Sequence, residues 1–229
     1  MIARPRPHVF INVAVTADGK LDTVERRGSA ISSAQDKARV DHLRASADAV
    51  MVGGQTLLGD DPKLTLKSAA LRAEREARGL PPHPAKVGVT SHLNLHPDSQ
   101  FLTAGPARII LFAPTSAAET DIAQLRARGV EVFLLGEARV DLPAALAQLK
   151  ALGIERLMVE GGGTLNFELL RLRLVDEVLV YIAPLIFGGQ SAPTLAAGTG
   201  LPYTEALRLK RQSVELEDEG GILIRYTVE

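Results

Sequence analysis

The chain has 229 residues, 46% hydrophobic and 23% charged, which suffices for a sizeable buried core. Its formal net charge of −1 argues against nucleic acid or a membrane surface as a partner, because the chain has no overall positive field to attract either. It has no cysteine, which excludes disulfides, a thiolate nucleophile and cysteine–zinc sites. Neither a signal peptide nor a membrane-spanning run is visible, so we expect a cytoplasmic protein.

The first half of the chain contains short apolar runs separated by irregular polar stretches. Ser33 can cap a helix that continues through Arg44, with Asp36 as the reciprocal partner of a capping box. Residues Ser68–Pro84 are rich in Ala, Arg and Glu and then in Pro, which predicts a short helix followed by a surface loop. Strands are expected at Val9–Val15, Asp48–Val52 and Lys86–Thr90.

From Ala107 onward, short apolar runs alternate regularly with helical patterns. Capping residues and glycine stops predict helices that begin at Ser116 and Asp141 and end near Gly129 and Gly153. Apolar residues at helical spacing predict a third helix over Thr164–Leu172. Strands are expected at Arg108–Phe112, Val130–Leu135, Ile154–Val159 and Val175–Ile182. A C-terminal hairpin is expected from Ala206–Glu217 and Gly221–Val228.

This alternation predicts an α/β fold, because strands separated by helices pair in parallel and the helices cover the sheet. We expect three layers, in which helices flank a mixed, mostly parallel sheet that ends in the C-terminal hairpin. Neither an internal repeat nor a long linker is visible. A single domain over residues 1–229, with its core at about 8–228, is the simplest account.

A glycine run, Glu160-Gly161-Gly162-Gly163-Thr164, stands directly between an expected strand and an expected helix. Glycines permit positive φ and close approach of a ligand to the backbone, and a helix N-terminus offers unpaired N–H groups to an anion. The run matches neither a Gly-x-Gly-x-x-Gly fingerprint nor a Walker loop. It predicts a phosphate-binding turn, with a tight turn that binds nothing as the alternative.

A second loop, Gly53–Pro62, here called the Thr56 loop, follows the expected strand Asp48–Val52. It lies at the carboxyl end of that strand, where open α/β sheets bind ligands. Thr56 offers a hydroxyl and Asp60 a carboxylate, both suited to ribose hydroxyls or an amide. In the alternative interpretation, Gly-Asp-Asp-Pro is only a turn whose Asp side chains cap backbone N–H groups. Magnesium is not favoured, because adjacent carboxylates diverge and no third ligand is evident.

Other polar residues allow two explanations each. Arg44 and Lys67 flank the Thr56 loop in sequence and together could grip a phosphate, although each alone is typical of a solvated surface charge. The motif Asp18-Gly19-Lys20 follows the first strand and is either a plain turn or a substrate-facing loop. The five histidines show no metal spacing, and no Ser, His and Asp arrangement suggests a triad, so no metal site is expected.

Four segments occur in an order found in one enzyme family: Val13–Lys20, Leu43–Thr65, Val159–Leu170 and Val175–Gly189. They resemble the reductase domain of riboflavin biosynthesis, which is fused to a pyrimidine deaminase in many bacteria and stands alone in archaea and fungi. The Gly-x-x-Thr-x-x-x-Asp-Asp-Pro-x-Leu stretch and the Glu-Gly-Gly-Gly-Thr turn carry most of this resemblance. It implies a dihydrofolate-reductase-like fold and a homodimer.

The resemblance also implies NADPH-dependent reduction of a ribosylaminopyrimidine 5′-phosphate to the ribitylamino compound, by hydride transfer to the sugar C1′. Residues that would bind NADPH are Thr56, Asp60, Ser91, Gly161, Gly162, Gly163, Thr164 and Leu165. Residues that would bind the substrate are Arg44, Leu64, Lys67 and Glu160. Asp18 and Glu160 are the carboxyl candidates for supplying a proton, with water as the alternative.

Several positions depart from the family pattern. Many bacterial members carry Trp where Ala30 stands and Arg where Lys67 stands, and Thr16-Ala17 replaces the more usual Ser-Leu. These departures leave two alternatives open. One is a reductase of the same fold acting on another pterin-like or carbonyl substrate, and the other is a non-catalytic NADPH-binding module. Without cysteine, the chain cannot contain a deaminase of the His/Cys/Cys zinc type.

Overall fold

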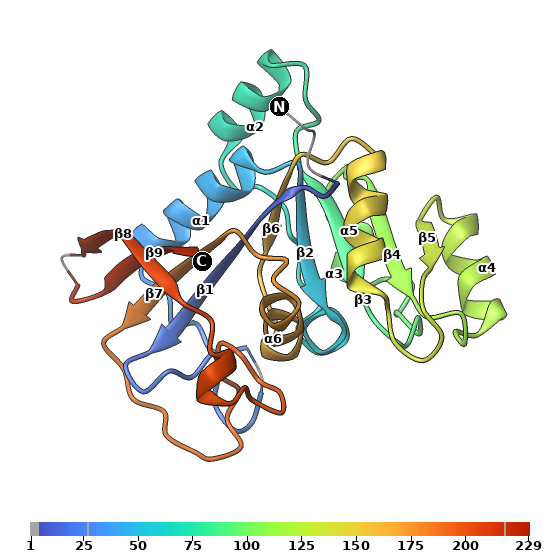
Figure 1. Ribbon diagram of the computed structural model, residues 1–229. Coiled ribbons are helices and arrows are strands. Elements are labelled where there is room, and N and C mark those ends of the chain that lie inside the picture. Colours follow the sequence, from blue (N-terminus) through green and yellow to red (C-terminus); the bar gives the residue numbers. More distant parts are fainter. Residues whose placement is uncertain (1–4, 27, 218) are drawn as a thin grey trace. The chain divides into compact units, whose positions relative to one another are not determined.

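The computed structural model describes residues 5–26, 28–217 and 219–229 (Figure 1). The chain forms two compact units, each built from segments far apart in the sequence. The first unit comprises Met1–His8 and Asp41–Met158, and the second comprises Val9–Val40 and Val159–Glu229. The expectation of a single domain therefore stays a prediction, and the two units are described separately below.

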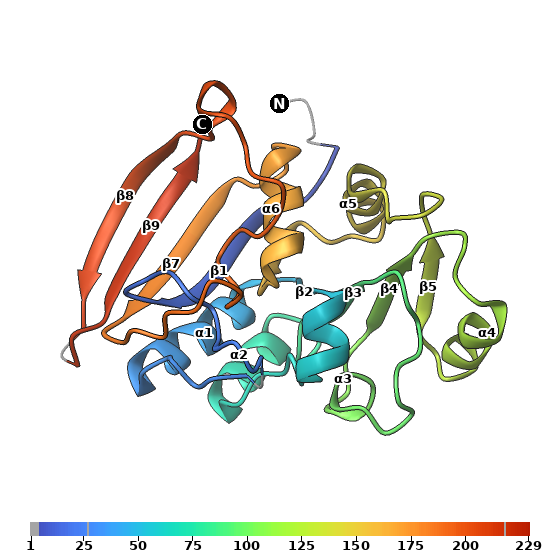
Figure 2. The same cartoon turned by 90° about the horizontal axis from the view of Figure 1, so that it is seen from below.

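The first unit holds strands in the order β5-β4-β3-β2-β6. The neighbours from β2 to β5 pair in parallel, and β2 is buried along its whole length. Helices α3 and α5 lie on opposite sides of these strands in Figure 2. The strands are β2 (Ala49–Gly53), β3 (Ala85–Val89), β4 (Ile109–Ala113), β5 (Glu131–Leu134) and β6 (Arg156–Val159). The helices are η1 (Thr56–Asp60), α2 (Ala69–Ala77), α3 (Gln100–Thr103), α4 (Glu119–Ala127) and α5 (Leu142–Ala151).

The second unit holds strands in the order β1-β7-β9-β8, which Figure 2 shows side by side. β1 and β7 are parallel, whereas β9 pairs antiparallel with both β7 and β8. The strands are β1 (His8–Thr16), β7 (Glu177–Ala183), β8 (Leu209–Leu216) and β9 (Ile222–Val228). Helix α1 (Ala34–Ser46) begins in this unit, which also contains α6 (Gly163–Arg171) and the short helix η2 (Tyr203–Glu205).

The structure confirms the expected strands and the antiparallel C-terminal hairpin. Asp141 caps α5 as predicted, because its carboxylate accepts a 2.9 Å hydrogen bond from the N–H of Ala144. The predicted cap at Ser116 is wrong. The N–H of Ala117 donates to the carbonyl of Pro114, so the backbone is still turning there, and α4 begins only after Ala118.

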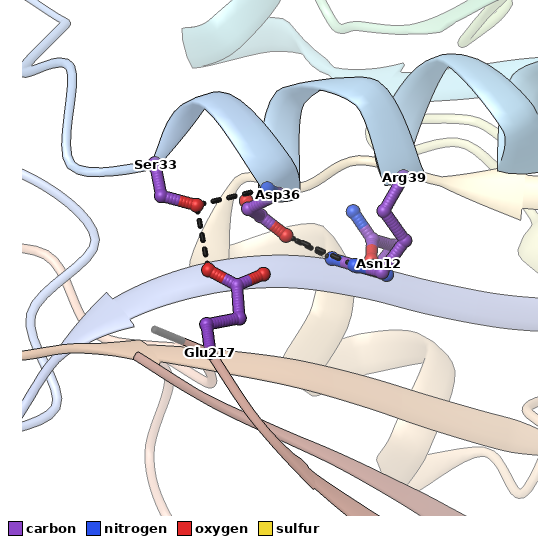
Figure 3. Close-up of polar contacts among 5 residues, drawn as sticks. All are labelled: Asn12, Ser33, Asp36, Arg39 and Glu217. Atoms are coloured by element: carbon purple, nitrogen blue, oxygen red, sulfur yellow. Dashed lines mark hydrogen bonds and ion pairs between the residues drawn. The ribbon is translucent and has the colours of Figure 1, made fainter. Parts of the chain in front are cut away.

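Helix α1 starts at its predicted cap, but only half of the predicted capping box forms (Figure 3). Ser33 Oγ accepts from the N–H of Asp36 at 2.9 Å and donates to Glu217 Oε2 at 2.6 Å. The Asp36 carboxylate does not turn back to Ser33 but accepts from Arg39 Nε at 3.0 Å. Arg39 Nη1 also donates to Asn12 Oδ1 on β1 at 2.8 Å. These contacts fasten the start of α1 to β1 and to the end of β8.

Candidate active site

In the first unit, two predicted cofactor segments emerge from neighbouring strands. β2 and β3 are parallel, and their carboxyl ends are in register. A Cβ on Gly54 would lie 2.8 Å from Thr90 Oγ1, so a glycine is needed for these strand ends to approach so closely. The register thus brings the Thr56 loop and Ser91 to the same edge of the unit.

The two aspartates of the Gly-Asp-Asp-Pro turn have different roles. Thr56 opens η1 and is half-buried, whereas Asp60 closes it and is exposed. Asp61 takes a left-handed φ of 45°, and its carboxylate accepts from the N–H groups of Gln100 at 2.7 Å and Phe101 at 2.9 Å. The turn interpretation, in which Asp caps backbone N–H groups, is therefore right for Asp61, and Asp60 is left facing outward.

Asp61 thus binds the N-terminal end of the short helix α3. Lys86, which the sequence did not single out, fixes the C-terminal end of the same helix. Its ammonium donates to the carbonyls of Phe101 at 2.8 Å and Ala104 at 2.6 Å. Burial lowers the pKa of Lys86 to about 8, opposed by the nearby Asp61 carboxylate. Helix α3 is thus held by an anion at its N-terminus and a cation at its C-terminus, which suits the helix dipole. The only sequence signal was a lysine inside a buried apolar run.

The segment Leu64–Ser68 belongs to no helix or strand, yet side chains fix its backbone. Three residues outside the segment hold it. Asp41 accepts from the N–H groups of Lys67 and Ser68, Arg72 Nη1 donates to the carbonyls of Leu66 and Lys67, and His83 Nδ1 accepts from the N–H of Leu66. Burial, reinforced by Arg72, lowers the pKa of His83, which keeps its imidazole neutral and able to accept. The segment is a preorganised platform.

Arg44 binds the backbone of this platform, and Lys67 belongs to it. Arg44 Nη1 donates to the carbonyl of Thr65 at 3.1 Å, and the exposed Lys67 follows two residues later. Ser68 is the N-cap of α2, so the positive end of a helix dipole lies at the same place. Arg72 adds a third cation that sequence reasoning missed. Cations next to a helix N-terminus suit a phosphate dianion, and the predicted grip of Arg44 and Lys67 on such a group stays a prediction.

Leu64 begins the platform in an unusual backbone conformation. Its φ is 50°, a region that leucine rarely adopts, and the residue is 1% exposed. Left-handed residues of this kind concentrate at constrained functional segments. Leu64 therefore supports the platform from inside, and its predicted contact with a substrate stays a prediction.

In the second unit, the three glycines of the Glu-Gly-Gly-Gly-Thr turn, here called the glycine turn, have different settings. Gly161 has a φ of 105°, and Gly162 is the extended N-cap of α6. A Cβ on Gly163 would lie 2.3 Å from the carbonyl oxygen of Thr194. The first turn of α6 contains no acidic residue and has no side-chain cap, Thr164 is exposed, and Leu165 is buried. The turn can therefore present backbone N–H groups to an anion, and it fits the phosphates of a dinucleotide.

The two predicted carboxyl groups, Asp18 and Glu160, lie in different settings. Asp18 accepts from Thr16 Oγ1 at 2.6 Å and from the N–H groups of Gly188 at 2.7 Å and Phe187 at 3.2 Å. The hydrogen bond from Thr16 lowers the pKa of Asp18, so the carboxyl is ionised and engaged as an anchor. This weighs against Asp18 as a proton donor. Glu160 is half-buried and directly precedes the three glycines of the turn.

Within residues 5–26, 28–217 and 219–229, no three His, Cys, Asp or Glu side chains are grouped as a metal ion would require. Over the same described part, every helix is too short or too polar to cross a bilayer.

The mixed sheet, its helices and the two candidate ligand loops define an α/β protein of the dihydrofolate-reductase-like class. The sequence matches the family described as RibD C-terminal domain over residues 7–223, and the chain belongs to this family. The resemblance inferred from the motifs is thereby confirmed.

Relatives and solved structures agree with this assignment. The chain is 42% identical to a 2,5-diamino-6-ribosylamino-4(3H)-pyrimidinone 5′-phosphate reductase from Archaeoglobus fulgidus, covering 84% of this chain and 87% of that protein. It is 40% identical to the protein of the same name from Methanothermobacter thermautotrophicus, covering 97% and 99%. Acinetobacter baumannii RibD superimposes with a TM-score of 0.81 at 24% identity, over 98% of this chain and 58% of that one. This likeness confirms the predicted fold class.

Proposed function

We propose that this protein is an NADPH-dependent reductase of riboflavin biosynthesis. It reduces a ribosylaminopyrimidine 5′-phosphate to the ribitylamino compound by hydride transfer to the sugar C1′. The observation that carries the proposal is the phosphate platform, where Arg44 binds the backbone of the segment that contains Lys67 and leads into the N-terminus of α2. The names of the two archaeal relatives support the same substrate class and make the diamino form the first substrate to test.

The cofactor part of the proposal rests on the two loops. The glycine turn and the start of α6 hold the cofactor phosphates through backbone N–H groups, with contacts from Gly161, Gly162, Gly163, Thr164 and Leu165. The Thr56 hydroxyl, the Asp60 carboxylate and Ser91 bind its hydroxyl or amide groups. When bound, NADPH supplies the hydride, and the protein supplies position and electrostatics.

The substrate part assigns roles to the remaining residues. Arg44 and Lys67 bind the 5′-phosphate, and Glu160 faces the pyrimidine or the sugar. Glu160 or a water molecule delivers the proton that C1′ reduction requires at nitrogen or oxygen. Asp18 is not assigned this step, because its carboxylate is already bound by Thr16, Phe187 and Gly188.

The test measures loss of NADPH absorbance with the deaminated and non-deaminated pyrimidine phosphates. Arg44→Ala and Lys67→Ala should each raise KM for a phosphorylated substrate by about tenfold or more, because a charge-assisted contact contributes about 1.5–3 kcal/mol. Cofactor affinity should stay nearly unchanged. Arg78→Ala is the matched control, since this exposed arginine lies at the opposite end of α2. Equal losses on phosphorylated and dephosphorylated substrate would remove the phosphate role.

We also propose a homodimer. The apolar stretch after β7 exposes Leu185 and Ile186, and the outermost strand β8 exposes Leu209, Val214 and Leu216. Apolar side chains on an edge strand favour a partner that covers them. Sedimentation across micromolar concentrations tests this proposal, and a monomer throughout would contradict it. The cytoplasmic location expected from the sequence stays a prediction.

A further inference from the structure

Residues 193–198, here called the 193–198 segment, connect two sequence motifs within the second unit. At one end, the N–H of Leu21 donates to the carbonyl of Pro193 at 2.8 Å, and Lys20 forms an isolated antiparallel bridge with Thr194. At the other end, the N–H of Ala197 donates to the carbonyl of Gly163 at 2.9 Å. The segment therefore touches both the Asp18–Lys20 turn and the glycine turn.

The fit between this segment and α6 is tight enough to require glycines on both sides. A Cβ on Gly163 would lie 2.3 Å from the carbonyl oxygen of Thr194, and a Cβ on Gly198 would lie 2.1 Å from the Phe167 ring. Real Cβ atoms do not approach other atoms so closely. The position of the segment is thus set by contact with the start of α6 and is not a loose connection.

Asn166 is the one polar side chain of α6 that is completely buried, and it points to the same contact. Its Nδ2 donates to the carbonyl of Leu195 at 2.9 Å. Its Oδ1 is buried and, among the described residues, has no hydrogen-bond partner. An unpaired buried carbonyl is destabilising. Asn166 thus makes one hydrogen bond to the 193–198 segment and leaves a buried acceptor unpaired, which points to the position of that segment as the role of the amide.

We propose that Asn166 is a positioning residue that fastens the 193–198 segment to the glycine turn. Through this segment, Asn166 fixes the geometry of the glycine turn relative to the Asp18–Lys20 turn. Binding of the cofactor phosphates at the glycine turn is thereby transmitted to the Asp18–Lys20 turn. The identity of the ligand rests on the proposed function, whereas the mechanical link rests on contacts within the second unit alone.

The first experiment compares Asn166→Leu with wild type by hydrogen exchange and by NADPH titration. Without ligand, amide exchange should become at least tenfold faster at residues 194–198 and 18–20. The dissociation constant for NADPH should rise at least tenfold. A purely structural role would lower the thermal midpoint and leave the dissociation constant unchanged. Unchanged exchange at 194–198 would overturn the proposal.

The matched control is Asn12→Leu. Asn12 is also a buried asparagine of the second unit, but its Oδ1 is satisfied by Arg39 (Figure 3). This variant should lower the thermal midpoint, with unchanged exchange at 194–198 and unchanged NADPH affinity. If Asn12→Leu weakens NADPH binding as much as Asn166→Leu, the proposed specificity of Asn166 is wrong.

A second variant, Ala197→Pro, removes the N–H that binds the Gly163 carbonyl and leaves Asn166 in place. It should reproduce the faster exchange at residues 18–20 and the weaker NADPH binding. Faster exchange with unchanged NADPH affinity in both variants would overturn the link to the ligand. If wild type does not bind NADPH at all, the proposed function fails, and the exchange data still decide whether Asn166 holds the segment.

Discussion

The Thr56 loop and the glycine turn are both proposed to hold one cofactor, but they are built in opposite ways. A charged side chain fastens the Thr56 loop, because the Asp61 carboxylate at its end binds the N-terminal N–H groups of α3, whose other end Lys86 holds. The glycine turn is organised by the absence of side chains at Gly161 and Gly163 and by the neutral amide of Asn166. The stability around the Thr56 loop and α3 should therefore depend on pH. The stability around the glycine turn should depend on added side-chain volume.

The largest effect is expected at Lys86, whose pKa falls from 10.5 to about 8 on folding. Between these values the unfolded chain binds the proton and the folded chain does not, so stability rises with pH. The penalty for the buried charge is fully present below pH 8 and disappears by about pH 10.5, a gain of about 3 kcal/mol at about 1.36 kcal/mol per pKa unit.

Urea unfolding of wild type and Lys86→Met across this pH range measures the difference. Wild type should gain stability relative to the variant as pH rises, because methionine carries no titrating group. Stability curves that run parallel would show that the Lys86 ammonium is well solvated in the folded protein.

The next largest effect on stability is expected when side-chain volume is added at Gly163. Gly163→Ala places a Cβ against the Thr194 carbonyl and should destabilise the protein by about 1–3 kcal/mol. Gly59→Ala is the matched control in the Thr56 loop, since a Cβ there meets nothing within 4 Å. The control should stay within about 0.5 kcal/mol of wild type in urea unfolding. Equal losses for both variants would contradict the contrast between the loops.

A substitution at Gly162 distinguishes the space that a ligand needs from packing within the protein. Gly162→Val should weaken NADPH binding by at least about tenfold, or about 1.4 kcal/mol, because the new side chain fills the space that the phosphates need. Circular dichroism should show a folded protein. A folded variant with unchanged affinity in a fluorescence titration would remove the phosphate role of this turn.

The smallest effect should distinguish the two adjacent aspartates. Asp61→Asn leaves only one acceptor oxygen for two N–H groups and should lower stability by about 1 kcal/mol. Asp60→Asn, at an exposed position, should lower stability less than Asp61→Asn and should weaken NADPH binding. A reversal of these two outcomes would exchange the structural and binding roles assigned here.

Much of the fold followed from local chemistry that can be recognised in the sequence. Apolar runs gave the strands, Asp141 and Ser33 capped their helices as expected, and the glycine run stands between β6 and α6. These features depend on neighbours within about one turn of the chain, so their physical causes are contained in short stretches of sequence. The motifs also sufficed to indicate the family.

Other features depend on segments that meet only after folding. Local spacing favoured Ser116 as a cap and a reciprocal bond from Asp36, and both expectations were wrong. The sequence also could not decide between a binding and a capping role for the Gly-Asp-Asp-Pro aspartates. Asp61 binds N–H groups 39 and 40 residues away, so the choice was made by a distant segment.

The same reason explains the residues that sequence reasoning missed. Lys86 binds carbonyls 15 and 18 residues further along the chain, and Asn166 binds a carbonyl 29 residues further along. A lone lysine, arginine or asparagine has the same appearance in sequence whether it is solvated or buried. Its partner and its burial, which set its charge state and its role, arise only when distant segments pack together.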